Sequence, residues 1–319
     1  MMSGKPVSGG AAGPWHWLSA SVRGAAHHRS GLPNQDAVRV ARCPLPDAAE
    51  GTDAPALVLA LADGHGSARS FRSREGARLA VAVALRAAAG LPPSSAPSRR
   101  KRWAEEQWPT TLVRGWQAAV AQRLARRTFT AAELDPLDAP GRAAVASHPA
   151  LAYGSTLLGV IVTPEAILYL QLGDGDLLTV GVDGTVARPL PPDARLLGNE
   201  TTSLCAPRAA EDVRVYCQTL AGAPPALILA ASDGYANAFR DDAGFLQVAQ
   251  DLWDLLRTGG EAAVRPHLRD WLAEASQQGS GDDISVAILW RAAPIAIAST
   301  AADPSPAHQP PRTAPCTNS

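Results

Sequence analysis

The ten residues Leu57 to Gly66, LVLALADGHG, join an apolar run of strand length to an aspartate, a histidine and two glycines. The apolar run is continuous rather than alternating, which is typical of a strand covered on both faces. Glycines after a buried strand indicate a turn, but a turn alone requires neither Asp63 nor His65. A carboxylate and an imidazole on such a loop are candidates for a metal or catalytic site. The alternative is a tight turn in which Asp63 caps its own backbone.

Composition limits the classes of function. The chain has 319 residues and a formal net charge of -1, so no basic field indicates a nucleic-acid partner or a membrane surface. No apolar run reaches membrane-spanning length, and the N-terminus has no apolar signal-like segment. The cysteines form no CxxC pair, which argues against a zinc site and a disulfide framework and predicts a reducing, cytoplasmic location. They are Cys43, Cys205, Cys217 and Cys316.

Four other aspartates stand at strand ends in the same manner as Asp63. Asp174 and Asp233 follow apolar runs that we interpret as strands, while Asp36 and Asp282 each come directly or closely before one. In an antiparallel sheet the end of one strand lies beside the start of its neighbour. All five carboxylates can therefore lie at one rim of a β-sandwich.

The remaining pattern predicts helices and strands in alternating blocks. An Ala/Leu-rich helix is expected over 67–89, a second helix up to about residue 127, a loop over 130–149, and a β-meander from 153 to 190. Two helices are expected at 243–257 and 261–277, before a last strand at 284–290. The arginines of the first helix form either a solvated face or a phosphate clamp, and we favour the solvated face. They are Arg69, Arg72, Arg74, Arg78 and Arg86.

Converging carboxylates need a compensating charge. Without one they repel each other and raise each other's pKa. Few basic residues flank these motifs, so bound cations are the natural compensation. Oxygen ligands without cysteine suit Mg²⁺ or Mn²⁺ better than Zn²⁺.

With these motifs in order, the chain resembles the metal-dependent serine/threonine protein phosphatases of the PP2C (PPM) family, in a bacterial branch. The matching stretches are Asn34-Gln35-Asp36-Ala37, Asp63-Gly64-His65-Gly66, Gly154-Ser155-Thr156, Leu172-Gly173-Asp174, Ala231-Ser232-Asp233-Gly234 and Gly281-Asp282-Asp283-Ile284-Ser285. A stretch Asn199-Glu200-Thr201 also matches the bacterial branch. The resemblance implies an α+β fold, an α-β-β-α sandwich of two mainly antiparallel sheets flanked by helices. The resemblance places the phosphatase domain at 15–292. The composition of the two ends predicts a flexible N-terminus at 1–14 and a disordered Pro/Ala/Ser-rich tail at 293–319.

The same resemblance implies roles for individual residues. Asp63 would bridge two Mn²⁺ or Mg²⁺ ions. Asp233 and Asp282 would complete the shell of the first ion, and the Gly64 carbonyl and the Asp36 region would serve the second. Asp174 matches the carboxylate linked to a third, weaker ion, and His65 matches the residue proposed as general acid.

Two positions depart from the family pattern. Gln35 stands where the family usually has a glutamate, and an amide is a poorer ligand for these ions. Gly31 stands where the family has the arginine that holds the substrate phosphate, so Arg29 is the nearby candidate for that role.

We therefore expect a protein serine/threonine phosphatase that hydrolyses phosphomonoesters with a hydroxide bridging its metals and opposes a Ser/Thr kinase. Two alternatives stay open from the sequence. One is a catalytically silent, phosphoprotein-binding domain, which Gln35 and the absent arginine favour. The other is a hydrolase of small phosphomonoesters, since the sequence reveals no substrate groove.

Overall fold

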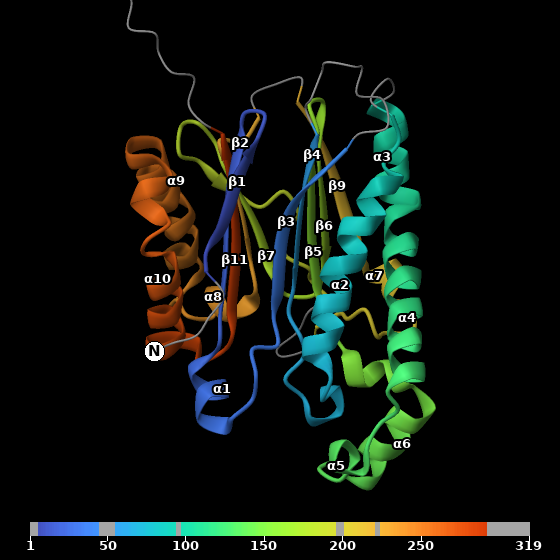
Figure 1. Ribbon diagram of the computed structural model, residues 1–319. Helices are drawn as coiled ribbons and strands as arrows, with labels where there is room; N and C mark the ends of the chain where they lie inside the picture. Colours follow the sequence, from blue (N-terminus) through green and yellow to red (C-terminus); the bar gives the residue numbers. More distant parts are fainter. Residues whose placement is uncertain (1–5, 45–54, 94–96, 196–200, 221–223, 292–319) are drawn as a thin grey trace, which may run out of the picture.

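The fold consists of two antiparallel sheets packed face to face, with helices on the outer face of each sheet (Figure 1). The computed structural model describes residues 6–44, 55–93, 97–195, 201–220 and 224–291. The expected α-β-β-α sandwich is confirmed. The expected tail at 293–319 and the pair Asn199-Glu200 lie outside the described residues.

One sheet has six strands and the other five, and all neighbouring strands are antiparallel. The first sheet runs in the order β1 (Ser8–Ala12), β2 (Trp15–Val22), β11 (Ile284–Arg291), β10 (Leu227–Ala231), β7 (Asp176–Val180) and β8 (Val186–Ala187). The second sheet runs β3 (Ala37–Cys43), β4 (Ala56–Ala62), β5 (Leu157–Val162), β6 (Ala166–Leu172) and β9 (Arg214–Thr219).

Strand β4 is buried on both faces, as its continuous apolar run predicts. All seven of its residues are buried. Leu57, Leu59 and Leu61 point into the core between the two sheets. Val58 and Ala60 belong to the core under the helices instead. The sandwich thus places the end of β4, and the Asp63 loop that follows it, between two packed layers.

Three long helices cover the second sheet and two cover the first (Figure 1). The former are α2 (Ser73–Ala87), α3 (Pro97–Glu106) and α4 (Trp108–Arg126), and the latter are α9 (Asp242–Val264) and α10 (Leu268–Ala275). The other helices are α1 (Ala25–Ser30), α5 (Ala131–Leu134), α6 (Ala139–Ser147), α7 (Ala209–Asp212) and α8 (Asp233–Ala236). Single turns lie at Ala68–Ser70, Ala88–Gly90, Pro149–Tyr153 and Ser276–Ser280.

The expected second helix is divided into α3 and α4 at Gln107. Pro109 occupies the first turn of α4, a position where proline is tolerated because its missing N–H has no partner within the helix. Residues 130–149, expected to form a loop, contain α5 and α6. Thr130 and Glu133 form a capping box at the start of α5, with reciprocal side-chain to backbone hydrogen bonds.

The expected β-meander is wrong in its pairing. Strands β5 and β6 belong to the second sheet, whereas β7 belongs to the first. The chain crosses between the sheets at Gly173-Asp174-Gly175, and Gly173 has a φ of 100° that a residue with a Cβ rarely adopts. Alternating side chains look alike in both arrangements, so the sequence pattern did not distinguish them.

Strand β1 lies inside residues 1–14, the segment expected to be a flexible terminus. It pairs antiparallel with β2, from Ser8 opposite Ser19 to Ala12 opposite Trp15. Backbone hydrogen bonds to a buried strand order even this Gly-rich sequence. In the part of the chain that the structure describes, we find no helix with the length and apolar character needed to span a membrane.

Candidate active site

Five aspartates gather where strands of both sheets begin or end at one end of the sandwich. Asp63 follows β4, Asp36 precedes its neighbour β3, and Ala37 pairs with Ala62 between them. On the other sheet, Asp233 comes two positions after β10, while Asp282 comes two positions before the adjacent strand β11. Asp174 occupies the crossing between β6 and β7.

Asp63 lies between two of the other carboxyl groups. Its carboxyl group lies next to those of Asp36 and Asp233, whose charges act on it. Asp233 also experiences the charges of Asp174 and Asp282. The structure therefore places Asp63 beside both Asp36 and Asp233, with Asp174 and Asp282 near Asp233 and Asp282 exposed to solvent.

The electrostatic consequence is a set of carboxyl groups that bind protons tightly. Burial, and then the charge of Asp283, raise the pKa of Asp36 to about 7. Burial together with the charges of Asp36 and Asp233 raises the pKa of Asp63 well above its usual range. The pKa of Asp233 is raised mainly by burial. At neutral pH this cluster thus favours a positive species among its oxygens, either a proton or a cation.

The free oxygens in the cluster fit a metal ion. Oδ1 of Asp36 and Oδ1 of Asp233 are both buried, and neither has a hydrogen-bond partner among the described residues. Buried polar atoms are normally paired, so these two acceptors of one carboxylate cluster are available to a ligand. The donor set is oxygen only, which fits Mg²⁺ or Mn²⁺.

The cluster is held by a hydrogen-bonded serine between the sheets. Ser232 Oγ donates to Oδ2 of Asp36 at 2.9 Å and accepts a 2.9 Å hydrogen bond from the backbone N–H of Ser285. Ser232 is 1% exposed, so bulk solvent does not reach this hydrogen bond. The sequence motif Ala231-Ser232-Asp233-Gly234 thus supplies both a carboxylate and the donor that orients its neighbour.

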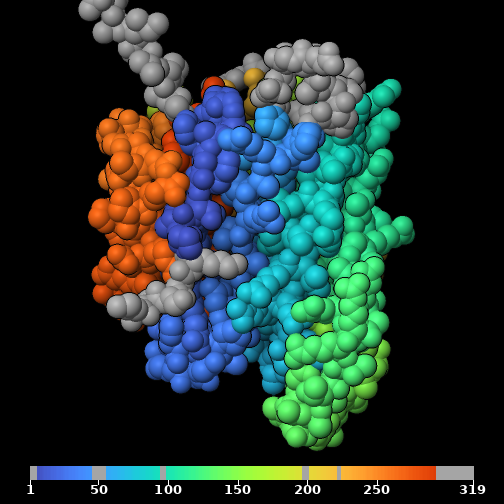
Figure 2. All heavy atoms as spheres, in the orientation of Figure 1, coloured from blue at the N-terminus to red at the C-terminus, as the bar shows by residue number. Residues whose placement is uncertain are grey.

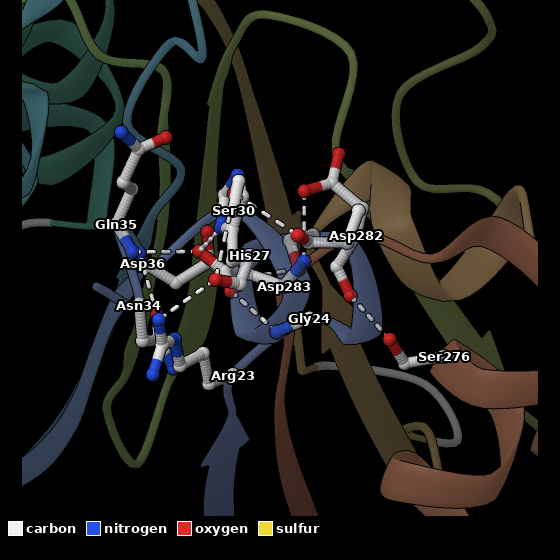
Figure 3. A network of polar contacts seen from close by, with 12 residues as sticks. Arg23, Gly24, His27, Ser30, Asn34, Gln35, Asp36, Ser276, Asp282 and Asp283 are labelled. Atoms are coloured by element: carbon white, nitrogen blue, oxygen red, sulfur yellow. Dashed lines mark hydrogen bonds and ion pairs between the residues drawn. The ribbon is translucent and has the colours of Figure 1, made fainter. Parts of the chain in front are cut away.

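Asp283 is a buried anchor for the segment that leads to Asp36 (Figure 3). Its Oδ1 accepts from the Gly24 N–H and its Oδ2 from the Gln35 N–H, both at 2.6 Å. Nδ1 of His27 lies 2.9 Å from the same Oδ2. Asp283 therefore fixes both ends of the α1 segment. The sequence reading did not assign it a role, although the doubled Asp282-Asp283 was the visible signal.

His65 is partly buried beside the cluster. Its backbone N–H donates to the Gly154 carbonyl at 3.1 Å, and its ring lies so close to Gly154 that a Cβ there would be 2.5 Å from Cδ2. Burial lowers the pKa of His65, while the charge of Asp174 opposes that shift. The imidazole is thus held near the carboxylates on the side of Asp174.

The backbone of the Asp63 loop is fixed by the Gly154-Ser155-Thr156 segment. The Thr156 N–H donates to the Asp63 carbonyl at 2.8 Å, and the Asp63 N–H donates to Thr156 Oγ1 at 3.1 Å. Gly64 forms an isolated β-bridge with Ser155. A Cβ on Gly64 would lie 2.8 Å from the carbonyl oxygen of Gln35, so only glycine fits between these segments.

Two arginines near α1 differ in their position. Arg29, the expected phosphate ligand, is exposed in the last turn of α1 and forms no ion pair with the described residues. Arg23 lines the same groove as Asp36, and its Nη2 donates to the His27 carbonyl at 2.7 Å. Its Nε is buried without a hydrogen-bond partner among the described residues. The buried side-chain oxygen Oε1 of Gln35 is also unpaired in that part of the chain.

Comparisons with known proteins agree on one family. The family model described as "Protein phosphatase 2C" matches residues 23–273. No curated protein sequence matches the chain significantly. Among solved structures, the catalytic domain of the serine/threonine protein phosphatase PstP, in complex with two manganese ions, is 17% identical with a TM-score of 0.51. That match covers 88% of this chain and 99% of PstP.

A second similar structure is the serine/threonine phosphatase Stp1 from Staphylococcus aureus. It is 11% identical with a TM-score of 0.54, and the match covers 92% of this chain and 98% of Stp1. A third, described as a bacterial serine phosphatase, is 11% identical with a TM-score of 0.51, over 86% of this chain and 97% of that one. At these identities the matches establish the shared fold.

Proposed function

Because the chain belongs to the protein phosphatase 2C family, it is a protein phosphatase, and we propose that it hydrolyses phosphoserine and phosphothreonine with Mn²⁺ or Mg²⁺ bound at the carboxylate cluster. The observation that carries the proposal is the contact of Asp63 with both Asp36 and Asp233, together with the unpaired buried oxygens of the last two. Neither a silent binding domain nor a tight turn needs such an arrangement.

The ion ligands in this proposal come from both sheets. Asp63 would serve two ions, because its carboxyl group lies between Asp36 and Asp233. Asp233 and Asp282 would hold one ion, Asp36 and the Gly64 carbonyl would hold the other, and Asp174 would hold a third, weaker one. When bound, the ions neutralise the phosphate oxygens and lower the pKa of the attacking water.

The other residues of the chain orient the substrate and move a proton. We place the substrate phosphate near Arg23 rather than Arg29, since Arg23 shares a groove with Asp36. His65 donates a proton to the leaving serine or threonine oxygen, whose basicity makes unassisted departure slow. Ser232 holds Asp36 in its orientation. We further propose a cytoplasmic enzyme that opposes a Ser/Thr kinase.

The test is phosphopeptide hydrolysis with Mn²⁺, Mg²⁺ and EDTA in parallel, for the wild type, Asp63→Asn and Asp233→Asn. We expect metal-dependent turnover in the wild type and its loss in both variants, with unfolding still cooperative. Asp183→Asn is the matched control, because Asp183 also follows a strand but lies in a hairpin turn, where its carboxylate accepts hydrogen bonds from Thr185. Full activity in either site variant would refute the site, and turnover of small phosphomonoesters without phosphopeptides would refute the substrate class.

A further inference from the structure

A groove of about 1020 Å³ begins at Asp36 and runs along the side of the sandwich. Its floor is formed by β2 and β3, and its walls are α2 from one layer and α10 from the other. Figure 2 looks onto this face, with the strands visible between the helices of the two outer layers. The groove is continuous with the site, since Asp36 and Arg23 form part of its lining.

The lining of the groove is strongly basic in a chain whose net charge is only -1. It contains five arginines against two aspartates, and one of those aspartates is Asp36 itself. The other, Asp270, lies on the α10 wall. The arginines are Arg23, Arg39, Arg74, Arg78 and Arg269.

Three of these arginines have no salt-bridge partner among the described residues. Arg39, Arg74 and Arg78 are exposed, and none forms a salt bridge within the described part of the chain. Other exposed arginines do find partners, for example Arg123 and Arg127, which both bind Glu75. Glu75 lies between Arg74 and Arg78 in sequence, but its carboxylate forms its ion pairs with Arg123 and Arg127.

Arg74 and Arg78 also repel each other. They stand one helical turn apart on α2, where like charges destabilise a helix. Burial, and then the charge of Arg74, lower the pKa of Arg78. A sequence that only needed a solvated helix face would gain by alternating the signs. An anionic ligand in the groove offsets this repulsion.

We propose that the groove binds an acidic segment of the phosphoprotein substrate, with Arg39, Arg74 and Arg78 contacting its carboxylates. This inference rests on the proposed function for its account of the phosphorylated residue. β3 is the edge strand of its sheet and leaves one row of backbone groups unused by strand pairing, which suits an extended peptide.

The geometry also sets the spacing in the substrate. Arg39 is three residues along β3 from Asp36, which is about 10 Å at the rise of a strand. An extended peptide covers that distance in about three residues. Arg78 lies one helical turn, about 5–6 Å, beyond Arg74. The preferred substrate therefore carries Asp or Glu about three to five positions from the phosphorylated residue.

The first experiment measures binding without metal, so that it does not depend on catalysis. Fluorescein-labelled, nonphosphorylated peptides with Asp or with Ala at positions three to five on either side of a central threonine are titrated with the full chain in EDTA at low salt. We expect the Asp peptide to bind at least about tenfold more tightly, and this preference to vanish near 0.5 M salt. Equal binding of the two peptides by the wild type overturns the inference.

The second comparison locates the binding. Arg74→Gln/Arg78→Gln should reduce the preference about fivefold or more, and adding Arg39→Gln should abolish it. Arg86→Gln/Arg114→Gln removes the same charge from exposed positions of α2 and α4 outside the groove. This control variant should keep the preference for the Asp peptide. Equal loss in both double variants would show a general charge effect and refute the groove. If an oligonucleotide binds the wild type more tightly than the Asp peptide does, and the groove variants no longer bind it, the peptide assignment is refuted.

The third readout is kcat/KM for the matching phosphothreonine peptides with Mn²⁺. The groove variants should lose the preference for the Asp peptide while hydrolysing p-nitrophenyl phosphate at the wild-type rate. If no phosphate ester is hydrolysed, the proposed function fails, and the metal-free titration still decides the groove. If all phosphopeptides are hydrolysed without preference, the groove assignment fails and the phosphatase stands.

Discussion

The hydroxyl of Ser232 donates a 2.9 Å hydrogen bond to Oδ2 of Asp36, a residue 196 positions earlier in the chain. Ser232 directly follows β10 in one sheet, and Asp36 directly precedes β3 in the other. The bond therefore crosses the sandwich at its active end. It occupies one oxygen of Asp36 and leaves the other, Oδ1, buried and available to a cation.

Ser232→Ala should weaken ion binding more than it weakens the fold. Loss of the bond to Asp36 frees a carboxylate to rotate, and loss of an outer hydrogen bond typically costs about tenfold in metal affinity. The unpaired Ser285 N–H should lower the free energy of unfolding by about 1–2 kcal/mol. Half-saturation of activity by Mn²⁺ and urea denaturation in EDTA measure the two effects. Ser30→Ala, which removes an exposed hydroxyl on α1, is the control; an unchanged Mn²⁺ requirement in Ser232→Ala would contradict the role.

Without metal, the free energy of unfolding should fall as pH rises from about 5 to about 8. The pKa of Asp36 is raised from 3.8 to about 7, so over this range the folded state holds a proton that the unfolded chain has released. Asp63 and Asp233 shift in the same direction. Saturating Mn²⁺ should reverse the slope, because the ion competes with protons for the same oxygens.

Urea denaturation at a series of pH values, in EDTA and in Mn²⁺, checks this expectation. Asp36→Asn should flatten the slope in EDTA, since the amide does not titrate. If the free energy of unfolding of the wild type in EDTA rises with pH across this range, the carboxyl groups do not have raised pKa values in the folded state.

His65→Ala should distinguish substrates by their leaving group. A general acid contributes about 10²–10⁴ in rate when the leaving oxygen is basic. The kcat for a phosphothreonine peptide should therefore fall at least about 100-fold more than that for p-nitrophenyl phosphate, whose leaving group is stable as an anion. His267→Ala, at an exposed position before α10 and outside the groove, controls for the loss of an imidazole. Equal losses on the two substrates would rule out proton donation by His65.

Glu133→Gln should destabilise the fold by about 1–3 kcal/mol at pH 7. Glu133 receives a bidentate contact from the buried guanidinium of Arg72, and hydrogen bonding to Arg72 is the main cause that lowers the pKa of Glu133 to about 2. A carboxylate whose pKa is lowered on folding stabilises the protein at pH values above its pKa in the unfolded chain. This stabilisation is lost as the pH falls toward its pKa in the folded state. The difference in the free energy of unfolding between wild type and variant, measured by urea denaturation, should therefore narrow as the pH falls from 4.5 to 2. A difference independent of pH would mean that packing, not charge, is responsible.

The strand-end aspartates were predictable because their signal is local. An apolar run that stops at Asp63 or Asp233 is visible in one short stretch, and antiparallel pairing then places such ends together. The crossing at Gly173 was not predictable in this way, since β6 is buried on both faces and its apolar run does not reveal which sheet β7 joins.

The residues that position the site and line the groove have partners far away in the sequence, so local sequence patterns predict them less well. Asp283 acts through backbone groups about 250 positions away, and the groove combines Arg39 of β3 with Arg74 and Arg78 of α2. The start of α5 did carry a local signal, because Thr130 and Glu133 have the spacing of a capping box.

Apart from Asp174 on the crossing, the carboxylates of the site are divided between the two sheets, with Asp36 and Asp63 on one and Asp233 and Asp282 on the other. Any ion shared between these pairs fixes the separation of the layers at that end, so a sideways displacement of one sheet against the other must change the affinity for the ion. By thermodynamic reciprocity, ion occupancy must equally resist such a displacement. A ligand lying between α2 and α10, which belong to opposite layers, would then influence ion retention through the mechanics of the sandwich.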